Sequence, residues 1–196
     1  MKATDMSDKE LIRRYLSGSQ YSLEQLISRH KGKVFAYILM VVKDQQLADD
    51  IFQDTFIKVI FTLRSGSYKE EGKFIQWVMR IAHNLIIDHY RKAKRMPLLD
   101  NDSDEYDIFD TLRQLEPSVE EQMVIDQIHS DVRSLIERLP DEQKQVLLMR
   151  HYGDMSFKDI AEQTNVSINT ALGRMRYALI NMRKMISDNQ LVLTMH

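Results

Sequence analysis

Three carboxylates stand close together in the N-terminal half of the chain, where they could hold a cation. Asp49, Asp50 and Asp54 lie in a stretch whose apolar residues recur at helical spacing. Asp50 and Asp54 are one helical turn apart, so their charges repel unless a partner neutralises them. Three interpretations are open: a divalent-metal site, a solvated helix face, or an acidic docking surface. Metal sites usually draw ligands from more than one element, and the sequence shows no facing cluster, so the residues do not favour a metal.

A second segment, residues 167–184, has side chains suited to nucleic acid. It contains four basic residues and no acidic residue. The apolar residues Ile168, Ala171 and Met175 are spaced to face inward on a helix. A helix that is apolar inside and cationic or amide-bearing outside suits the major groove of DNA. The outward-facing residues in this interpretation are Asn169, Thr170, Arg174 and Arg176.

A shorter helix and a tight turn precede this basic segment. Ser156 can cap the short helix by accepting a backbone N–H bond, and Phe157 and Ile160 fall on one of its faces. Asn165 lies in the turn, and asparagine tolerates left-handed backbone better than other non-glycine residues. Ser167 then caps the second helix. This arrangement predicts a helix-turn-helix unit, but an ordinary two-helix hairpin with a solvated basic face has the same pattern.

Another basic face is expected on a helix over residues 73–94. Cations at its end suit the helix dipole, but the dipole does not explain Arg80 near its start. A loop with Gly66, Gly72 and an exposed Tyr68 comes just before it. Basic side chains beside an aromatic ring suit unstacked, single-stranded DNA. The polar face comprises Arg80, Asn84, Arg91 and Arg95, with His83 and Lys92 beside them.

Composition limits the remaining classes. The chain has 196 residues, enough for one domain or two small ones, and its three prolines and six glycines leave long helices possible. The absence of cysteine excludes disulfides and thiolate metal sites. No apolar run approaches the length of a membrane span, so we expect a cytoplasmic protein without membrane insertion. The histidines are scattered and no glycine-rich phosphate loop is present, so we expect no enzyme and no cofactor. The net charge of −2 still permits DNA binding, because the charges are segregated.

Hydrophobic periodicity predicts helices on both sides of a polar stretch. The pairs Ser7–Glu10 and Ser22–Gln25 have the spacing of capping boxes and are expected to open the first two helices. His30 falls on the apolar stripe of the second helix and is interpreted as a core-edge residue rather than a ligand. The acidic run at residues 96–117 disfavours compaction and predicts a flexible linker. The sequence therefore predicts an all-α chain of two small helical domains, residues 1–95 and 118–187, with a frayed tail at 188–196.

These segments together resemble the extracytoplasmic-function (ECF) sigma factors of bacterial transcription over nearly the whole chain. Residues 47–56 (LADDIFQDTF) are similar to the family segment D-x-x-Q-[ED]-[TV]-F. Residues 74–84 (FIQWVMRIAHN) are similar to F-x-x-W-L-x-R-I-A-x-N. Residues 167–175 (SINTALGRM) look like the recognition helix S-x-G-T-V-K-S-R-L, and Leu139-Pro140 precedes a helix as in the family. Two motif blocks in the family's order are far more specific than one helix-turn-helix.

The resemblance implies that residues 1–95 are sigma region two and residues 118–187 are sigma region four. The surface formed by Asp50, Gln53 and Asp54 would dock on the clamp helices of the polymerase β′ subunit, which decides against metal. The loop with Tyr68 would capture a flipped base of the −10 element. The residues that would follow the melting strand are Arg80, Asn84, Arg91 and Arg95.

In the same comparison, region four would read the −35 element and meet the β flap of core RNA polymerase. An anti-sigma factor would be the regulator, and the chain would direct polymerase to promoters and stabilise strand opening without being an enzyme. The residues that would contact the −35 element are Asn169, Thr170, Arg174, Arg176 and Tyr177.

Four residues depart from the family pattern. Leu172 and Tyr177 stand where basic residues are common, and Asn165 replaces a usual glycine. Gly173 replaces a small hydroxyl residue and costs the helix about 1 kcal/mol relative to alanine. The alternative function is a free-standing helix-turn-helix regulator that binds palindromic duplex DNA as a dimer. The basic, tryptophan-bearing helix and the acidic linker favour the sigma factor, and the acid-free cationic helix argues against an adaptor without a DNA role.

Overall fold

This computed structural model describes residues 6–93 and 119–191. All regular elements within these two ranges are α-helices. The predicted all-α class is therefore confirmed. The chain divides into two compact units, the first containing α1–α4 and the second most of α5–α8. The predicted linker at 96–117, Arg95 and the end of the predicted tail lie outside the described residues. The helices of the first unit are α1 (Asp8–Leu16), α2 (Gln20–Val42), α3 (Gln45–Arg64) and α4 (Phe74–Ala93).

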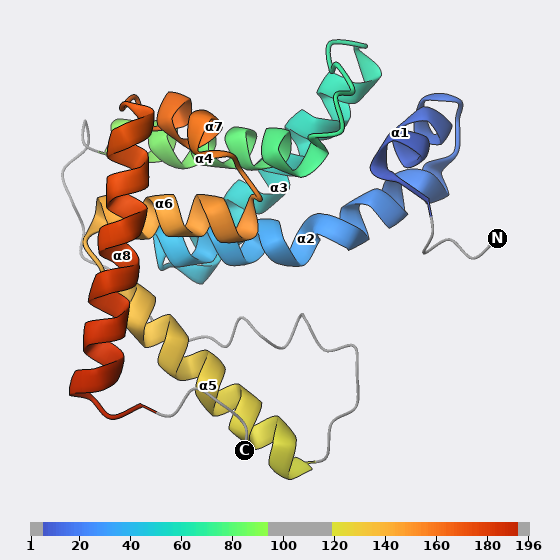
Figure 1. The fold of residues 1–196 in the computed structure, drawn as a ribbon. Coiled ribbons are helices and arrows are strands. Elements are labelled where there is room, and N and C mark those ends of the chain that lie inside the picture. Colours follow the sequence, from blue (N-terminus) through green and yellow to red (C-terminus); the bar gives the residue numbers. More distant parts are fainter. Residues whose placement is uncertain (1–5, 94–118, 192–196) are drawn as a thin grey trace. The chain divides into compact units, whose positions relative to one another are not determined.

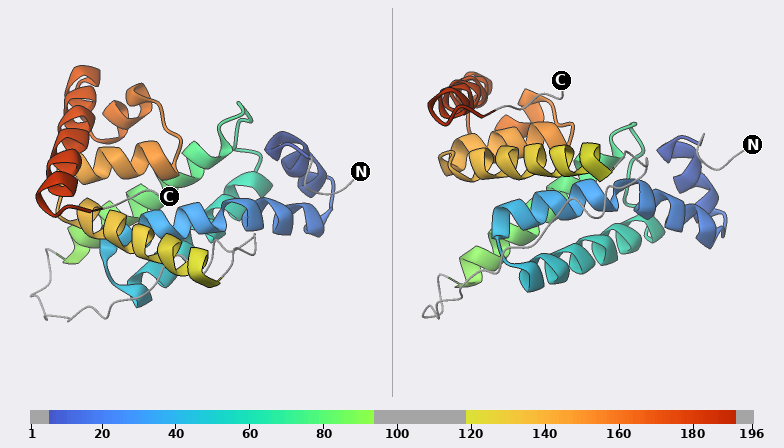
Figure 2. Two further views of the ribbon diagram at one scale, coloured as in Figure 1. Left: turned by 60° about the horizontal axis from the view of Figure 1, so that its bottom comes forward. Right: turned by 90° about the horizontal axis from the view of Figure 1, so that it is seen from below.

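In the first unit α2, α3 and α4 pack against one another, and α1 lies against α2 and α3 (Figures 1 and 2). Each helix contributes one apolar face to the core. Asp44 starts α3, where its carboxylate accepts a hydrogen bond of 2.8 Å from the backbone N–H of Leu47. The fully buried side chains include Leu26, Val34, Ile38, Val59, Val78 and Ala82.

The start of α2 differs from the prediction. Ser7 caps α1 by accepting from the N–H of Glu10, which is one half of the predicted capping box, whereas the Glu10 carboxylate pairs with Arg13 and Arg14. Ser22 does not cap α2, because the helix already begins at Gln20 and Ser19 occupies the N-cap position, just after the left-handed Gly18. Ser22 is instead buried inside the helix, and its hydroxyl donates to the hydroxyl of Ser19 at 3.0 Å. The predicted Ser22–Gln25 capping box is therefore wrong.

The second unit contains the predicted helix-turn-helix. In it α8 packs on α5 and α7, and its core includes Leu135, Leu148 and Ile160. Its helices are α5 (Val119–Glu137), α6 (Asp141–Tyr152), α7 (Phe157–Gln163) and α8 (Ile168–Asp188).

Local chemistry fixes the turn between α7 and α8. Ser156 and Asp159 form a capping box at the start of α7, and Ser167 accepts from the N–H of Thr170 at the start of α8. Asn165 has a φ of 54°, the left-handed conformation expected for the turn. Ile168 is an exception to the predicted inward face, because 46% of it is exposed. It is the first helical residue, and a helical side chain leans toward the N-terminus, here beyond the end of the helix.

Candidate nucleic-acid interface

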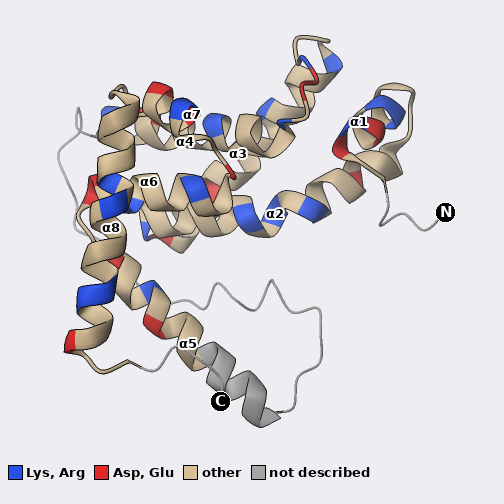
Figure 3. Cartoon of the chain, viewed as in Figure 1, with Lys and Arg blue, Asp and Glu red and all other residues tan. Residues whose placement is uncertain are grey.

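The outer face of α8 is exposed and free of acidic side chains over most of its length. Asp188, its last residue, is the one acid within the helix (Figure 3). Arg174 is part-buried. The other predicted −35 residues are exposed: Asn169, Thr170, Arg176 and Tyr177. The structure therefore presents this set on one helix, with cations available to phosphates.

Contacts from α6 hold the short helix and α8 in place. One guanidinium nitrogen of Arg150 donates to the carbonyl of Met155 at 2.8 Å, and the same group lies 5.7 Å from the ring centre of Phe157. The side-chain amide of Asn181 on α8 donates to Gln143 on α6 at 2.8 Å. These bonds fix the outward face of α8 relative to its own unit.

The basic face of α4 is present but narrower than predicted. Arg80, Asn84 and Arg91 are exposed on the same side of the helix, and Arg91 pairs with Asp88 at 3.4 Å. His83 does not belong to this face. It is buried, and its Nδ1 lies 2.9 Å from the hydroxyl of Tyr37 on α2. Burial lowers the pKa of His83 to about 4, so the ring is neutral at pH 7.

Tyr68 is part-buried, contrary to the exposed ring that was predicted. Its ring lies 4.3 Å from that of Trp77 and meets Phe74 edge-on at 6.1 Å. Its hydroxyl donates to Glu70 at 3.2 Å, and the other carboxylate oxygen of Glu70 accepts from the N–H of Gly72 at 2.6 Å. Burial, followed by the negative charge of Glu70, raises the pKa of Tyr68. The loop before α4 is thus closed by Glu70 over an aromatic cluster.

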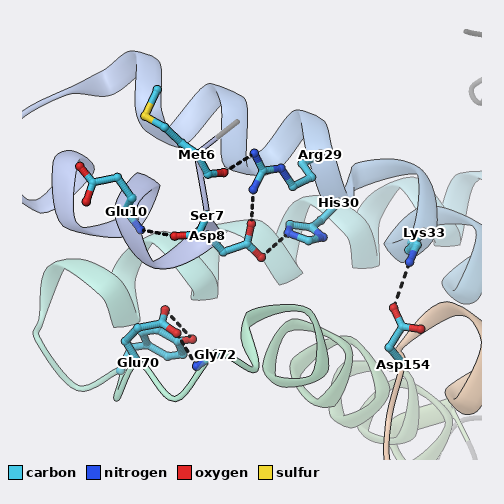
Figure 4. A network of polar contacts seen from close by, with 11 residues as sticks. Met6, Ser7, Asp8, Glu10, Arg29, His30, Lys33, Glu70, Gly72 and Asp154 are labelled. Atoms are coloured by element: carbon cyan, nitrogen blue, oxygen red, sulfur yellow. Dashed lines mark hydrogen bonds and ion pairs between the residues drawn. The ribbon is translucent and has the colours of Figure 1, made fainter. Parts of the chain in front are cut away.

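An ion-pair network joins α1 to α2 (Figure 4). The Asp8 carboxylate accepts from Arg29 at 2.6 Å and bonds Nε2 of His30 at 2.8 Å, while Arg29 also donates to the carbonyl of Met6 at 2.7 Å. Burial raises the pKa of Asp8, but the bonds and charges of His30 and Arg29 outweigh it and hold the pKa below its usual value. His30 is buried at the core edge and faces Phe74 at 5.5 Å, so its interpretation as a structural residue agrees with the geometry.

The acidic face of α3 is exposed as predicted, and it continues into an apolar patch that the sequence analysis missed. Ile57 is 62% exposed and Phe61 73% exposed. They follow Asp54 by three and seven residues, so they extend its face of the helix. The sequence could have indicated this patch, because Ile57 and Phe61 fall outside the helical line of buried residues Ile51, Thr55 and Val59. We call the set Asp50, Gln53, Asp54, Ile57 and Phe61 the α3 surface; all five side chains are exposed.

The described residues contain neither a metal-ligand cluster nor a helix that could span a membrane. Within residues 6–93 and 119–191, no three carboxylate or imidazole side chains converge as metal ligands would. Over the same ranges, no helix combines the length and the apolar character needed to cross a bilayer.

Comparison with known proteins identifies both units. The family model described as Sigma-70 region 2 matches residues 26–96, and the model described as Sigma-70, region 4 matches residues 129–176. The RNA polymerase sigma-H factor of Pseudomonas aeruginosa is 28% identical over 175 residues, 87% of this chain and 89% of that protein. The ECF RNA polymerase sigma-E factor of Haemophilus influenzae is 26% identical over 190 residues, 95% of this chain and 96% of that protein.

Solved structures show the same fold. The sigma factor RpoE from Bartonella quintana, in complex with the anti-sigma factor NepR, matches with a TM-score of 0.61 at 15% identity, over 84% of this chain and 96% of that one. CnrH, in complex with the cytosolic domain of CnrY, matches with a TM-score of 0.59 at 19% identity, over 92% and 97%.

The two matches follow one another along the chain, region 2 before region 4, and each falls almost entirely in one of the two units. The chain belongs to the ECF group of the sigma-70 family and is a transcription initiation factor that acts with RNA polymerase. Sigma factors are transcription factors without catalytic activity of their own, and the polymerase is the enzyme.

Proposed function

We propose that this sigma factor binds core RNA polymerase through the α3 surface, and contacts promoter DNA through the exposed faces of α4 and α8. The observation that carries the proposal is the segregation of charge. Exposed carboxylates lie on α3, whereas α8 carries no acid before its last residue. A protein surface and a polyanion can therefore bind at separate places on one chain whose net charge is only −2.

The α3 surface suits a protein partner with basic residues. Asp50 and Asp54 are exposed and one turn apart, which favours a cationic partner that relieves their repulsion. Ile57 and Phe61 add exposed apolar area, and removing such area from water is the main driving force of most protein association. The β′ clamp helices are the proposed partner, with the β flap meeting the second unit.

The −10 element is assigned to α4 and the loop before it. Arg80, Asn84 and Arg91 supply polar contacts to the separating strand, with Arg95 beyond the described residues. The part-buried Tyr68 rests on Trp77, so a flipped base would stack on the remaining surface of this pair. Glu70 holds the loop closed and would set how far the base enters.

The −35 element is assigned to the outer face of α8. Its N-terminal half carries residues of the types that read base edges and phosphates, since asparagine pairs with adenine and arginine with guanine or phosphate. The contacting residues in this assignment are Asn169, Thr170, Arg174, Arg176 and Tyr177.

An anti-sigma factor is the proposed regulator. It would cover the apolar part of the α3 surface. Phe61 is 73% exposed, and a partner that removes its ring from water lowers the free energy of the complex. One structural relative, RpoE of Bartonella quintana, was solved with an anti-sigma factor, which supports a partner of this kind.

Binding of the purified chain to bacterial core RNA polymerase, with and without promoter DNA, tests the proposal. The expected result is tight binding to core and engagement of DNA only when core is present. Tight binding to palindromic duplex DNA as a dimer, with no affinity for core, would overturn it in favour of a free-standing regulator.

A further inference from the structure

Neither backbone conformation nor close packing requires a glycine at position 173 in α8. Gly18, Gly66 and Gly72 have positive φ angles, which explains glycine at those places. Gly173 has an ordinary helical backbone, and a Cβ added to it would meet no atom within 4 Å. Glycine is less favourable than any residue except proline inside a helix. The fold would therefore accept alanine here at no steric cost and with better helix propensity.

The surroundings of Gly173 give it a position on the face that approaches DNA. It lies four residues after Asn169 and three before Arg176, so these side chains flank it on the helix surface. Leu172 is 44% exposed and Tyr177 61% exposed beside it. We call the uncovered backbone between these four side chains the Gly173 gap. Glycine is used where backbone and ligand approach closely, and here the candidate ligand is the major groove.

The chemistry of the gap limits what it can accept. Its floor is the Cα of Gly173, and one wall is the aliphatic side chain of Leu172. Neither the Cα of Gly173 nor the side chain of Leu172 can donate or accept a conventional hydrogen bond. The major groove presents donors, acceptors and a single type of apolar group, the C5 methyl of thymine. Asn169 and Arg176 remain available for the neighbouring bases or phosphates.

We propose that a thymine of the −35 element places its C5 methyl group in the Gly173 gap, against Leu172. This inference rests on the proposed reading of the −35 element by α8. It assigns a specificity role to two residues that differ in type from those usual at these positions.

The test uses holoenzyme assembled from the full chain and bacterial core RNA polymerase. An upstream element is first selected from duplexes randomised at the −35 position. Each thymine of the selected element is then replaced by deoxyuridine, which removes only the methyl group. We expect one replacement to weaken binding by about three- to five-fold, the effect of one buried methyl group, and the others to change it by less than two-fold.

Two variants locate the methyl group. In Leu172→Ala, the preference for thymine over deoxyuridine at that position is expected to fall toward one. In Gly173→Ala, binding of the thymine duplex is expected to weaken by three-fold or more, while the melting temperature is unchanged or higher. Ser187→Ala, at the far end of α8, is the matched control and should keep both the preference and the affinity.

The outcomes separate the two proposals. Selection of no upstream element would overturn the −35 assignment of α8 and this inference with it. Selection of an element in which every deoxyuridine duplex binds as tightly as its thymine parent would overturn the thymine inference alone. Unchanged affinity and preference in both Leu172→Ala and Gly173→Ala would also overturn it.

Discussion

The hydroxyl of Tyr37 and Nδ1 of His83 lie 2.9 Å apart in the buried part of the first unit, where they join α2 to α4. Burial lowers the pKa of His83 to about 4. The pair therefore holds a neutral imidazole on the same helix that carries the exposed Arg80 and Asn84, which face DNA in the proposed function. A contact between two core side chains thus helps to fix the direction in which α4 presents a candidate DNA-binding face.

Stability of the first unit should fall as the pH falls from about 6.5 to about 4. Unfolded His83 gains a proton below about pH 6.5, whereas folded His83 does so only at about 4. Between these values the unfolded state binds more protons, so the free energy of unfolding decreases, by roughly 2–3 kcal/mol in all. Denaturant titrations followed by the fluorescence of Trp77, the single tryptophan, report on this unit.

A His83→Gln variant is the control for this dependence. It keeps a polar partner for Tyr37 but cannot take up a proton, so it should lose much less stability over the same pH range. Asp8 does not interfere, because its folded pKa lies below the ordinary value of 3.8, and its contribution is lost only at more acidic pH. An equal decrease in variant and wild type would show that His83 is not the titrating group.

Replacing Asp8 by asparagine should loosen α1. The change removes the charge that holds Arg29 and His30, and an isolated partner left part-buried costs about 1–3 kcal/mol. In the Asp8→Asn variant, amide hydrogen exchange in α1 should be faster than in wild type, whereas exchange in α3 should be unchanged. The comparison is Glu10→Gln, whose ion pairs with Arg13 and Arg14 stay within α1 and on its surface. Equal protection in Asp8→Asn and wild type would mean that the network does not anchor the helix.

Charge reversal on the α3 surface should weaken polymerase binding strongly without unfolding the chain. Asp50→Lys and Asp54→Lys place cations where a basic partner is proposed, and both positions are exposed. We expect at least a ten-fold weaker affinity for core polymerase and an unchanged circular dichroism spectrum. Glu24→Lys changes an exposed acid on α2 by the same two charge units and should bind core normally. Normal binding by both α3 variants would remove this surface from the interface.

Removal of two arginines from α8 should weaken DNA binding in a salt-dependent way. Each lost phosphate contact lowers the slope of log affinity against log salt by about 1, and each lost base contact costs about 1–3 kcal/mol. The Arg174→Ala, Arg176→Ala double variant is compared with Arg183→Ala, Lys184→Ala, which removes the same charge from the other half of the helix. The −35 assignment predicts reduced promoter use in the first pair only. Equal use of promoters by wild type and the first double variant would contradict it.

The sequence predicted correctly those features that depend only on residues within one helix or its adjacent turn. The serine caps at Ser7, Ser156 and Ser167 and the left-handed Asn165 follow from local chemistry, and the structure contains all four. The exposed acids of α3 followed from helical spacing alone.

Sequence reasoning failed where contacts outside a single regular helix decide the outcome. His83 lies at the border of the apolar face, and its burial depends on Tyr37, 46 residues away. Tyr68 belongs to a loop whose conformation depends on Glu70 and Trp77. No periodicity encodes either contact, so the basic face of α4 was drawn too wide and Tyr68 too exposed. The roles of individual residues toward DNA and polymerase remain predictions.

The mixed character of the α3 surface has a consequence for the order in which complexes come apart. Salt screens its carboxylates, but it does not weaken the burial of Ile57 and Phe61, which are 62% and 73% exposed in the free chain. The DNA contacts proposed for the arginines of α8 would weaken steeply with ionic strength. As salt rises, the factor should therefore release the promoter before it releases the polymerase. A cell whose ionic strength increases would retain assembled holoenzyme in a searching, unbound state.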